Sequence, residues 1–264
     1  FENGVEQELA YFSSQDAPFT VALMLDMSYS TVFKLNEIQA AALLFIAQLR
    51  KDDKVMIVSF DEKVRILCEA TDNRKALRYA IEGAKIGSGT SVYTAVDNVL
   101  NDKLNSITGR KAIVLLSDGV DTTSKTAKAA DIIRDIDEMD TLIYPLQYDT
   151  FDDVRDNRRK DAMVVYDDDD RPYVVEAPLA KGEKEDDYRE AREFLADIAS
   201  HSGGRVQRVS STTNLNSAFA RIADELRKIY SLGYYPSSEK TPGKRYSSRV
   251  RVYRPDLDIR ARDN

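Results

Sequence analysis

The sequence predicts an α/β fold with a doubly wound, mostly parallel central sheet flanked by helices. Apolar runs alternate along the chain with segments of helical periodicity, which is the pattern of such sheets. The first run, residues 19–26, is a continuous apolar segment ending in Asp26, as expected for a strand buried on both faces. The 264 residues, 42% of them hydrophobic, are enough to bury one sizeable core.

The expected strands follow from further apolar runs. Besides the first, we expect strands within residues 54–61, 111–119, 141–149 and 203–209. Residues 63–70 follow a short turn at Asp61 and Glu62, which indicates an antiparallel strand at the sheet edge. Cys68 lies in that segment and is expected to be a small apolar filler.

The expected helices follow from apolar side chains spaced three and four residues apart. They lie within residues 35–49, 92–100, 132–139, 191–198 and 215–229. Together with the strands, they define a main domain over residues 19–232.

Two regions interrupt this alternation. Residues 149–187 are crowded with charge, and we interpret them as a surface insertion in the crossover between two strands. Within them, the aspartates at 167–170 lack the glycine and glutamate of a calcium loop, so we expect a solvated acidic run, with Ca²⁺ binding as the alternative. Residues 233–264 show strand alternation at Val250 and Val252, which predicts a C-terminal antiparallel β extension, a hairpin or a three-strand addition.

The tail that begins at residue 231 also carries several apolar side chains and many arginines. We expect it to pack on the domain, because its apolar residues are too numerous to stay in water. These are Leu232, Tyr234, Tyr235, Val250 and Val252. The arginines suit either solubilising charge on a sheet edge or a docking surface.

Composition excludes several classes of protein. Acidic residues outnumber basic ones by 45 to 38, giving a net charge of −7, which argues against a general nucleic-acid binder. The single cysteine excludes an intramolecular disulfide and a thiolate zinc cluster. No apolar run reaches the roughly 20 residues of a membrane span. The chain starts at Phe1 rather than Met, as expected of a trimmed or processed chain.

One short loop offers oxygen ligands for a metal ion. Asp26 ends the first strand, and Ser28 and Ser30 follow it with spacing that lets both hydroxyls face the same way. Carboxylate and hydroxyl oxygens are the hard ligands that Mg²⁺ prefers. Aspartate and serine are also common caps and turn formers at strand ends, so this loop alone is a weak signal.

Two further loops strengthen the signal. Residues 87–90 (GSGT) place the hydroxyl of Thr90 before a helix, and residues 117–124 (SDGVDTTS) place Asp118 after a buried strand. In a doubly wound sheet these loops meet at one crevice. Two carboxylates and three hydroxyls there make an octahedral set with a position left for a ligand. The GSG sequence lacks the lysine of a phosphate loop, and its glycines suit close approach of the backbone to the metal.

These residues resemble the metal-ion-dependent adhesion site of the von Willebrand factor type A fold, a Rossmann-like fold. Its pattern is DxSxS, then a threonine, then an aspartate, and all of its positions are present here. The resemblance implies that Ser28, Ser30 and Thr90 contact the metal directly or in a ligand-dependent way. Asp26 and Asp118 would act partly through water. The metal would be Mg²⁺, or Mn²⁺ or Ca²⁺.

The resemblance extends along nearly the whole chain outside the insertion. FENGVEQELAYFSSQDAP, SDGVDTTS and AFARIADELRKIYSLGYYP are similar to segments of the von Willebrand type A-related proteins abundant in Acidobacteria. This implies that residues 1–18 are the remnant of an upstream β-rich segment and that the protein is exported. Tyr29 departs from the commoner glycine, as in integrin β subunits, and would shape the ligand surface.

Two function classes follow. The first is a non-enzymatic protein-interaction or adhesion module in which an exposed Asp or Glu of a partner protein completes the metal shell; a glycan or matrix polymer is another possible ligand of this class. Specificity would come from the residues around the crevice, which are Tyr29, Ser91, Tyr93 and Val120. The alternative is a metal-dependent hydrolase of phosphoesters or peptides. The three loops supply no spare base for it, and His201, the only histidine, is expected to be a helix C-terminal residue.

Overall fold

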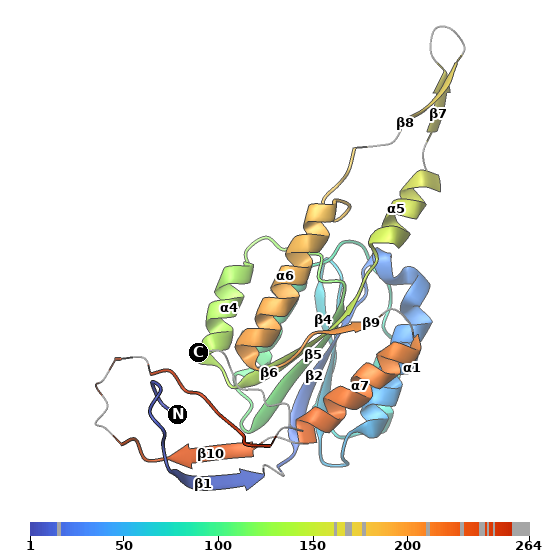
Figure 1. Ribbon diagram of the computed structural model, residues 1–264. Helices are drawn as coiled ribbons and strands as arrows, with labels where there is room; N and C mark the ends of the chain where they lie inside the picture. The colour runs from blue at the N-terminus through green and yellow to red at the C-terminus, as the bar shows by residue number, and fades with distance from the viewer. Residues whose placement is uncertain are drawn as a thin grey trace.

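A six-stranded sheet forms the centre of the molecule (Figure 1). The computed structural model describes residues 1–14, 17–160, 163–166, 171–175, 178–209, 212–227, 230–237, 241, 243–244 and 246–254. The strand order is β4-β3-β2-β5-β6-β9. Their bounds are β2 Phe19–Asp26, β3 Lys54–Phe60, β4 Val64–Thr71, β5 Arg110–Ser117, β6 Thr141–Tyr148 and β9 Gln207–Val209. Only β4, at one edge, is antiparallel to its neighbour, so the predicted mostly parallel sheet and its antiparallel edge strand are confirmed.

Helices cover both faces of the sheet (Figure 1). One face packs against α1 (Leu35–Gln48), α2 (Arg74–Glu82) and α7 (Thr212–Arg227). The other packs against α3 (Val92–Asp97) with its continuation η2 (Asn98–Leu104), α4 (Ala129–Glu138) and α6 (Glu185–Ser202). Each expected helix is present in the described residues, and α2 is an additional one that the sequence interpretation did not include.

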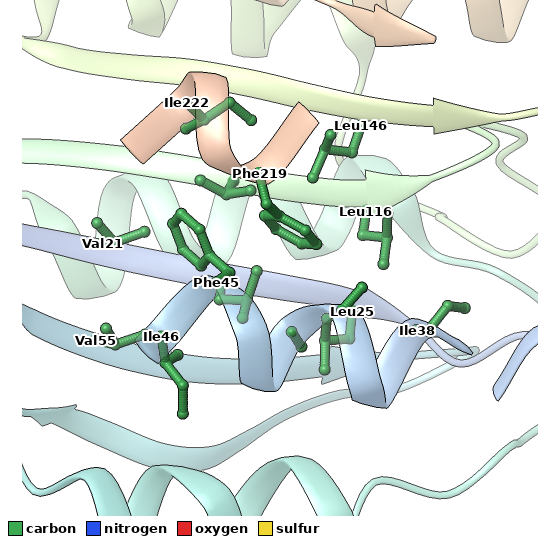
Figure 2. Close-up of a cluster of buried hydrophobic side chains, with 14 of the residues drawn as sticks. Val21, Leu25, Ile38, Phe45, Ile46, Val55, Leu116, Leu146, Phe219 and Ile222 are labelled. Carbon is green, nitrogen blue, oxygen red and sulfur yellow. The ribbon is translucent and has the colours of Figure 1, made fainter. Parts of the chain in front are cut away.

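The core between the sheet and helices α1 and α7 is aromatic at its centre. Phe45 of α1 and Phe219 of α7 stack with ring centroids 4.8 Å apart (Figure 2). Both side chains are fully buried, as are Val21 and Leu25 of β2 beneath them. Burial of each large apolar side chain contributes about 1.5–3 kcal/mol, so this layer holds β2 rigidly in the middle of the sheet.

A separate two-stranded ribbon joins the beginning and the end of the described chain. β1 (Leu9–Ser14) pairs antiparallel with β10 (Tyr230–Tyr234), beyond the amino ends of the central strands (Figure 1). The predicted C-terminal antiparallel extension is therefore present, but its partner is the N-terminal segment. The hairpin expected within the tail is not found in the described residues, where Ser248 forms an isolated bridge with Glu2.

Part of the apolar surface of this ribbon and tail stays in solvent. Phe12 and Tyr230 stack with centroids 5.4 Å apart, yet they are 65% and 54% exposed. Val250 and Val252 are each 40% exposed. The tail thus packs against the N-terminal segment, but the expectation that its apolar side chains leave water is wrong for Tyr235, Val250 and Val252.

The charged insertion forms an arm beyond the carboxyl ends of the strands. It contains α5 (Phe151–Lys160) and a hairpin of β7 (Met163–Tyr166) and β8 (Pro172–Val175), which projects away from the sheet (Figure 1). The acidic run at 167–170 lies outside the described residues, so its expected role is not addressed. Within the described part of the chain, no helix is both long and apolar enough to cross a membrane.

Candidate metal centre

Asp26 and Asp118 lie side by side at the point where the sheet changes its winding direction. Asp26 is the last residue of β2, and Asp118 follows directly after β5, the strand that pairs with β2 in parallel. The helix after β2 covers one face of the sheet, and the helix after β5 covers the other. Ligands of open α/β sheets bind in the crevice that this reversal creates.

Backbone hydrogen bonds hold the three expected loops together. The amide of Gly87 donates to the carbonyl of Met27 over 2.8 Å, which joins the second loop to the first. The amide of Thr122 donates to the carbonyl of Thr90 over 2.8 Å, which joins the third loop to the second. The amide of Thr90 also donates to Oγ1 of Thr122 over 2.8 Å. The structure therefore brings Asp26, Thr90 and Asp118 to one place.

The carboxylate of Asp26 is fully buried and accepts hydrogen bonds at both oxygens. Ser117 Oγ donates to Oδ2 over 2.6 Å, and the amide of Ser28 donates to Oδ1 over 3.0 Å. Burial, followed by the charge of Asp118, raises the pKa of Asp26 from 3.8 to about 7, against the opposing effect of these hydrogen bonds. A carboxylate held in this way is stabilised in its charged form by a nearby cation.

The carboxylate of Asp118 is oriented from two directions. The amide of Val120 donates to its Oδ1 over 3.0 Å. Thr150 Oγ1 donates to its Oδ2 over 2.6 Å, and the Thr150 oxygen lies 3.0 Å from the hydroxyl of Tyr188 on α6. Asp118 is thus connected to the start of the inserted arm and to the helix that follows it.

The first loop continues into a short 3₁₀ helix, η1 (Tyr29–Lys34). Ser28 is buried just before it, and Ser30 lies within it, although the side chain of Ser30 is outside the described part of the structure. Thr31 closes the loop, because its hydroxyl donates to the carbonyl of Ser28 over 2.7 Å and to that of Asp26 over 3.3 Å. This closure holds the backbone of the DxSxS segment.

The four residues expected to flank the ligand differ in exposure. Tyr29 is 67% exposed, and Tyr93 is partly buried against the ring of Phe194. Ser91 and Val120 are buried, and the Ser91 hydroxyl lies 2.6 Å from that of Thr123. Ser91 and Val120 are therefore too buried to contact a ligand and instead pack beneath the crevice. Of these four residues, Tyr29 and Tyr93 are the ones with solvent-exposed surface.

In the glycine-rich loop, Gly87 packs closely against the side chain of Asp61. A Cβ on Gly87 would lie 1.9 Å from Oδ2 of Asp61, a carboxylate that accepts from the Lys63 amide over 2.7 Å and from Arg65 over 2.8 Å. The absence of a side chain at Gly87 thus allows the loop to pack on Asp61. The expected approach of the glycine backbone to a metal ion stays a prediction.

The donor set at the crevice fits a hard divalent cation. Two carboxylates and neighbouring hydroxyls are the oxygen ligands that Mg²⁺, Mn²⁺ and Ca²⁺ accept. Across the described residues, no cluster of three or more His, Cys, Asp or Glu side chains could hold a metal ion, so a site of the zinc type has no support there. The raised pKa of Asp26 agrees with a site built for a cation.

Asp121, on the third loop, is engaged in hydrogen bonds. It accepts from the amides of Tyr93 and Ser124, each over 3.0 Å. His201, the only histidine of the chain, lies in the last turn of α6, as expected, beside the start of β6 and therefore at the edge of the sheet opposite the crevice; its Nδ1 is 2.7 Å from a carboxylate oxygen of Asp137.

Sequence reasoning missed four residues that build the site. Ser117, Thr31 and Thr150 orient the two carboxylates and the first loop, and Tyr148 ends β6 beside them. Ser117 was visible in the sequence as the last residue of the apolar run before Asp118. Thr150 could not be recognised, because its contact with Asp118 depends on the register between β5 and β6.

Comparison with known proteins agrees with this geometry. Residues 21–120 match the family model for the von Willebrand factor type A domain. A comparison with curated protein sequences gives no significant match.

Solved structures share the fold at low sequence identity. An aerotolerance-related membrane protein from Bacteroides fragilis is 16% identical with a TM-score of 0.54, over 80% of this chain and 100% of that chain. The vWF domain of the type V pili tip protein Mfa5 from Porphyromonas gingivalis is 12% identical with a TM-score of 0.58, over 81% and 96%.

The pilus adhesin SpaC from Lactobacillus rhamnosus GG is 12% identical with a TM-score of 0.57, over 81% of this chain and 30% of that chain. Identities this low establish the fold and leave the ligand open. Together, the family match over residues 21–120 and the six-stranded sheet show that this chain has the Rossmann-like fold of von Willebrand factor type A domains.

Proposed function

We propose that the protein is a non-enzymatic, metal-dependent interaction or adhesion module that binds an acidic group of a partner protein. A divalent cation, Mg²⁺ or alternatively Mn²⁺ or Ca²⁺, would be held by five residues: Asp26, Ser28, Ser30, Thr90 and Asp118. The observation that carries the proposal is the burial of Asp26 beside Asp118, which raises the pKa of Asp26 to about 7. Such a pair of carboxylates is stabilised when a cation lies between them.

A carboxylate of the partner would complete the coordination of the cation. Because the cation attracts the incoming carboxylate and the carboxylate in turn stabilises the bound cation, each binding event would strengthen the other. The exposed ring of Tyr29 and the partly exposed ring of Tyr93 would contact the groups around that carboxylate. Ser91 and Val120 would support the crevice from beneath.

The structural neighbours support an adhesive role and a surface location. Two of them are described as a pilus adhesin and a pilus tip protein, and a third as a membrane protein. We therefore propose that this domain acts outside the cytoplasm, exported or at the cell surface. A metal-dependent hydrolase remains the alternative, and assays on phosphoesters and peptides that compare the native protein with Asp118→Ala distinguish the two.

Thermal unfolding in EDTA and in Mg²⁺ or Mn²⁺ tests the metal site. We expect the native protein to gain stability with metal, because only the folded chain assembles the three loops. Asp26→Ala and Asp118→Ala should each abolish that gain, while Glu138→Ala, at the exposed end of α4, should retain it. An equal gain in both aspartate variants would place the metal elsewhere and overturn the proposal.

A further inference from the structure

A fourth loop lies against the metal centre. β5 and β6 pair in parallel up to Ser117 and Gln147, so the next residues along the two strands, Asp118 and Tyr148, are neighbours at the carboxyl edge. The loop that starts at Tyr148 then leads into α5 and the inserted arm. The type A sequence pattern draws no residue from this loop.

The hydroxyl of Tyr148 is buried without a hydrogen-bond partner among the described residues. The side chain is 6% exposed. Burial and then the charges of Asp26 and Asp118 raise the pKa of Tyr148 well above its ordinary value, so the phenol oxygen lies within electrostatic reach of both carboxylates. A buried, unpaired hydroxyl destabilises the folded state, and a site that supplies its acceptor would remove this cost.

The segment around Tyr148 contacts two of the other loops, and one of these contacts is with the Tyr148 ring itself. Lys34, at the end of η1, lies over the ring at 5.7 Å from its centroid. The Lys34 ammonium also donates to the carbonyl of Asp149 over 3.4 Å and lies 3.3 Å from Oδ2 of Asp153. Thr150, two residues after Tyr148, holds Asp118. The fourth loop is therefore attached to both the first and the third loop of the metal centre.

We propose that Tyr148 is a positioning residue of the metal centre, whose hydroxyl donates a hydrogen bond to an oxygen atom bound to the divalent cation. That oxygen belongs to a carboxylate of the site, to water or to the acidic group of the partner. The inference rests on the proposed function, because it requires a divalent cation at Asp26 and Asp118. It adds a residue outside the DxSxS, threonine and aspartate pattern.

Tyr148→Phe tests the inference, because the change has opposite effects with and without metal. In EDTA the variant should be as stable as the native protein or more stable, since an unpaired buried hydroxyl is removed. In calorimetric titration with Mn²⁺ its affinity should fall about three- to tenfold, the effect of one hydrogen bond. Tyr144→Phe is the matched control, because Tyr144 is buried in the same core on the same strand, about 13 Å further from the site.

A spectroscopic readout on the native protein adds a second test. The chain has 14 tyrosines and no tryptophan, so its near-ultraviolet absorption reports tyrosine environments. Addition of Mn²⁺ should change this absorption in the native protein and in Tyr144→Phe, and less so in Tyr148→Phe. An absent change in the native protein would overturn the inference, whether or not Tyr148→Phe folds.

The possible failures are distinguishable. Unchanged Mn²⁺ affinity in Tyr148→Phe would overturn the role of Tyr148 and leave the proposed metal site standing. A native protein that does not bind Mn²⁺ or Mg²⁺ would overturn both. If Tyr148→Phe is less stable than the native protein in EDTA but binds Mn²⁺ with unchanged affinity, the hydroxyl serves the packing of the core. This outcome would also overturn the inference.

Discussion

The hydroxyl of Ser117 donates a 2.6 Å hydrogen bond to Oδ2 of Asp26, which links the last residue of β5 to the last residue of β2. The same hydroxyl oxygen accepts from the amide of Gly119 over 2.9 Å. Ser117 therefore sets the spacing between the two loops that carry the candidate carboxylates. It does so from a fully buried position, where water cannot replace a lost partner.

Ser117→Ala should destabilise the protein by about 1.5–3 kcal/mol at pH 8, because a hydrogen bond to a charged, buried carboxylate is lost. Urea unfolding in EDTA measures this difference. Ser106→Ala is the control, since the Ser106 hydroxyl makes only an exposed bond to the Lys103 carbonyl, and its effect should stay below about 0.5 kcal/mol. Equal effects of the two substitutions would contradict the assigned role of Ser117.

The stability of the metal-free protein should fall as pH rises from about 4 to about 7. The pKa of Asp26 is raised from 3.8 to about 7 in the folded state, so the folded chain holds a proton across this range that the unfolded chain has released. Stability then decreases with pH between the two values. Urea unfolding in EDTA at a series of pH values measures the slope, and Asp26→Asn should flatten it. A slope unchanged in Asp26→Asn would refute the assignment to Asp26.

The stability that the protein gains from bound metal should depend on pH in the opposite direction to the stability of the metal-free protein. The proton and the cation compete for the Asp26 carboxylate, so the stability gained with Mn²⁺ should increase as pH rises through about 7. Thermal unfolding at fixed Mn²⁺ concentration, at pH 6 and pH 8, gives the comparison. A gain that is larger at the lower pH would show that the metal does not compete for this group.

Gly87→Ala should cost about 1–3 kcal/mol of stability, because the new methyl group must displace the carboxylate of Asp61. A double-mutant cycle with Asp61→Ala isolates the cause. In the Asp61→Ala background the added methyl meets no carboxylate, so Gly87→Ala should cost much less there. If the cost is the same in both backgrounds, the constraint on Gly87 lies in its backbone.

Thr150→Val keeps the shape of the side chain and removes the donor to Asp118. We expect a loss of about 1–3 kcal/mol, because a buried carboxylate oxygen loses a hydrogen bond of 2.6 Å. Thr150→Ser keeps the hydroxyl and should restore most of the stability in urea unfolding. If the serine variant is as unstable as the valine variant, packing of the Thr150 methyl group accounts for the effect.

The central sheet could be predicted well from the sequence, because each of its strands is recognisable from its own residues. Each parallel strand is a run of apolar residues, and the core helices carry apolar stripes that fit the faces of the sheet. Helix α2 was missed because only Leu77, Ala80 and Ile81 are buried on it. Its clearest signal is Asn73, whose side chain accepts from the first amides of the helix and caps it.

Pairings between distant segments could not be predicted. β1 pairs with β10 across more than 200 residues of chain, and the strand alternation of the tail does not specify which segment it pairs with. Thr150 and Tyr148 lie beside the candidate metal centre for the same reason, since only the register of β5 and β6 places them there. The residues of the DxSxS, threonine and aspartate pattern can be recognised from the sequence alone, whereas the residues that hydrogen-bond to them depend on the fold.

The ribbon of β1 and β10 also gives the domain a mechanical weak point. Leu9 pairs with Tyr234 and Ser14 with Tyr230, so the outer ends of the two strands lie at the same end of the ribbon. A pulling force applied at those ends loads one pair of residues at a time. The inter-strand hydrogen bonds therefore break one after another, and the two strands separate at low force. Asp26 and Asp118 lie at the opposite edge of the sheet, at the carboxyl ends of β2 and β5, so the two carboxylates can keep their positions when the ribbon separates.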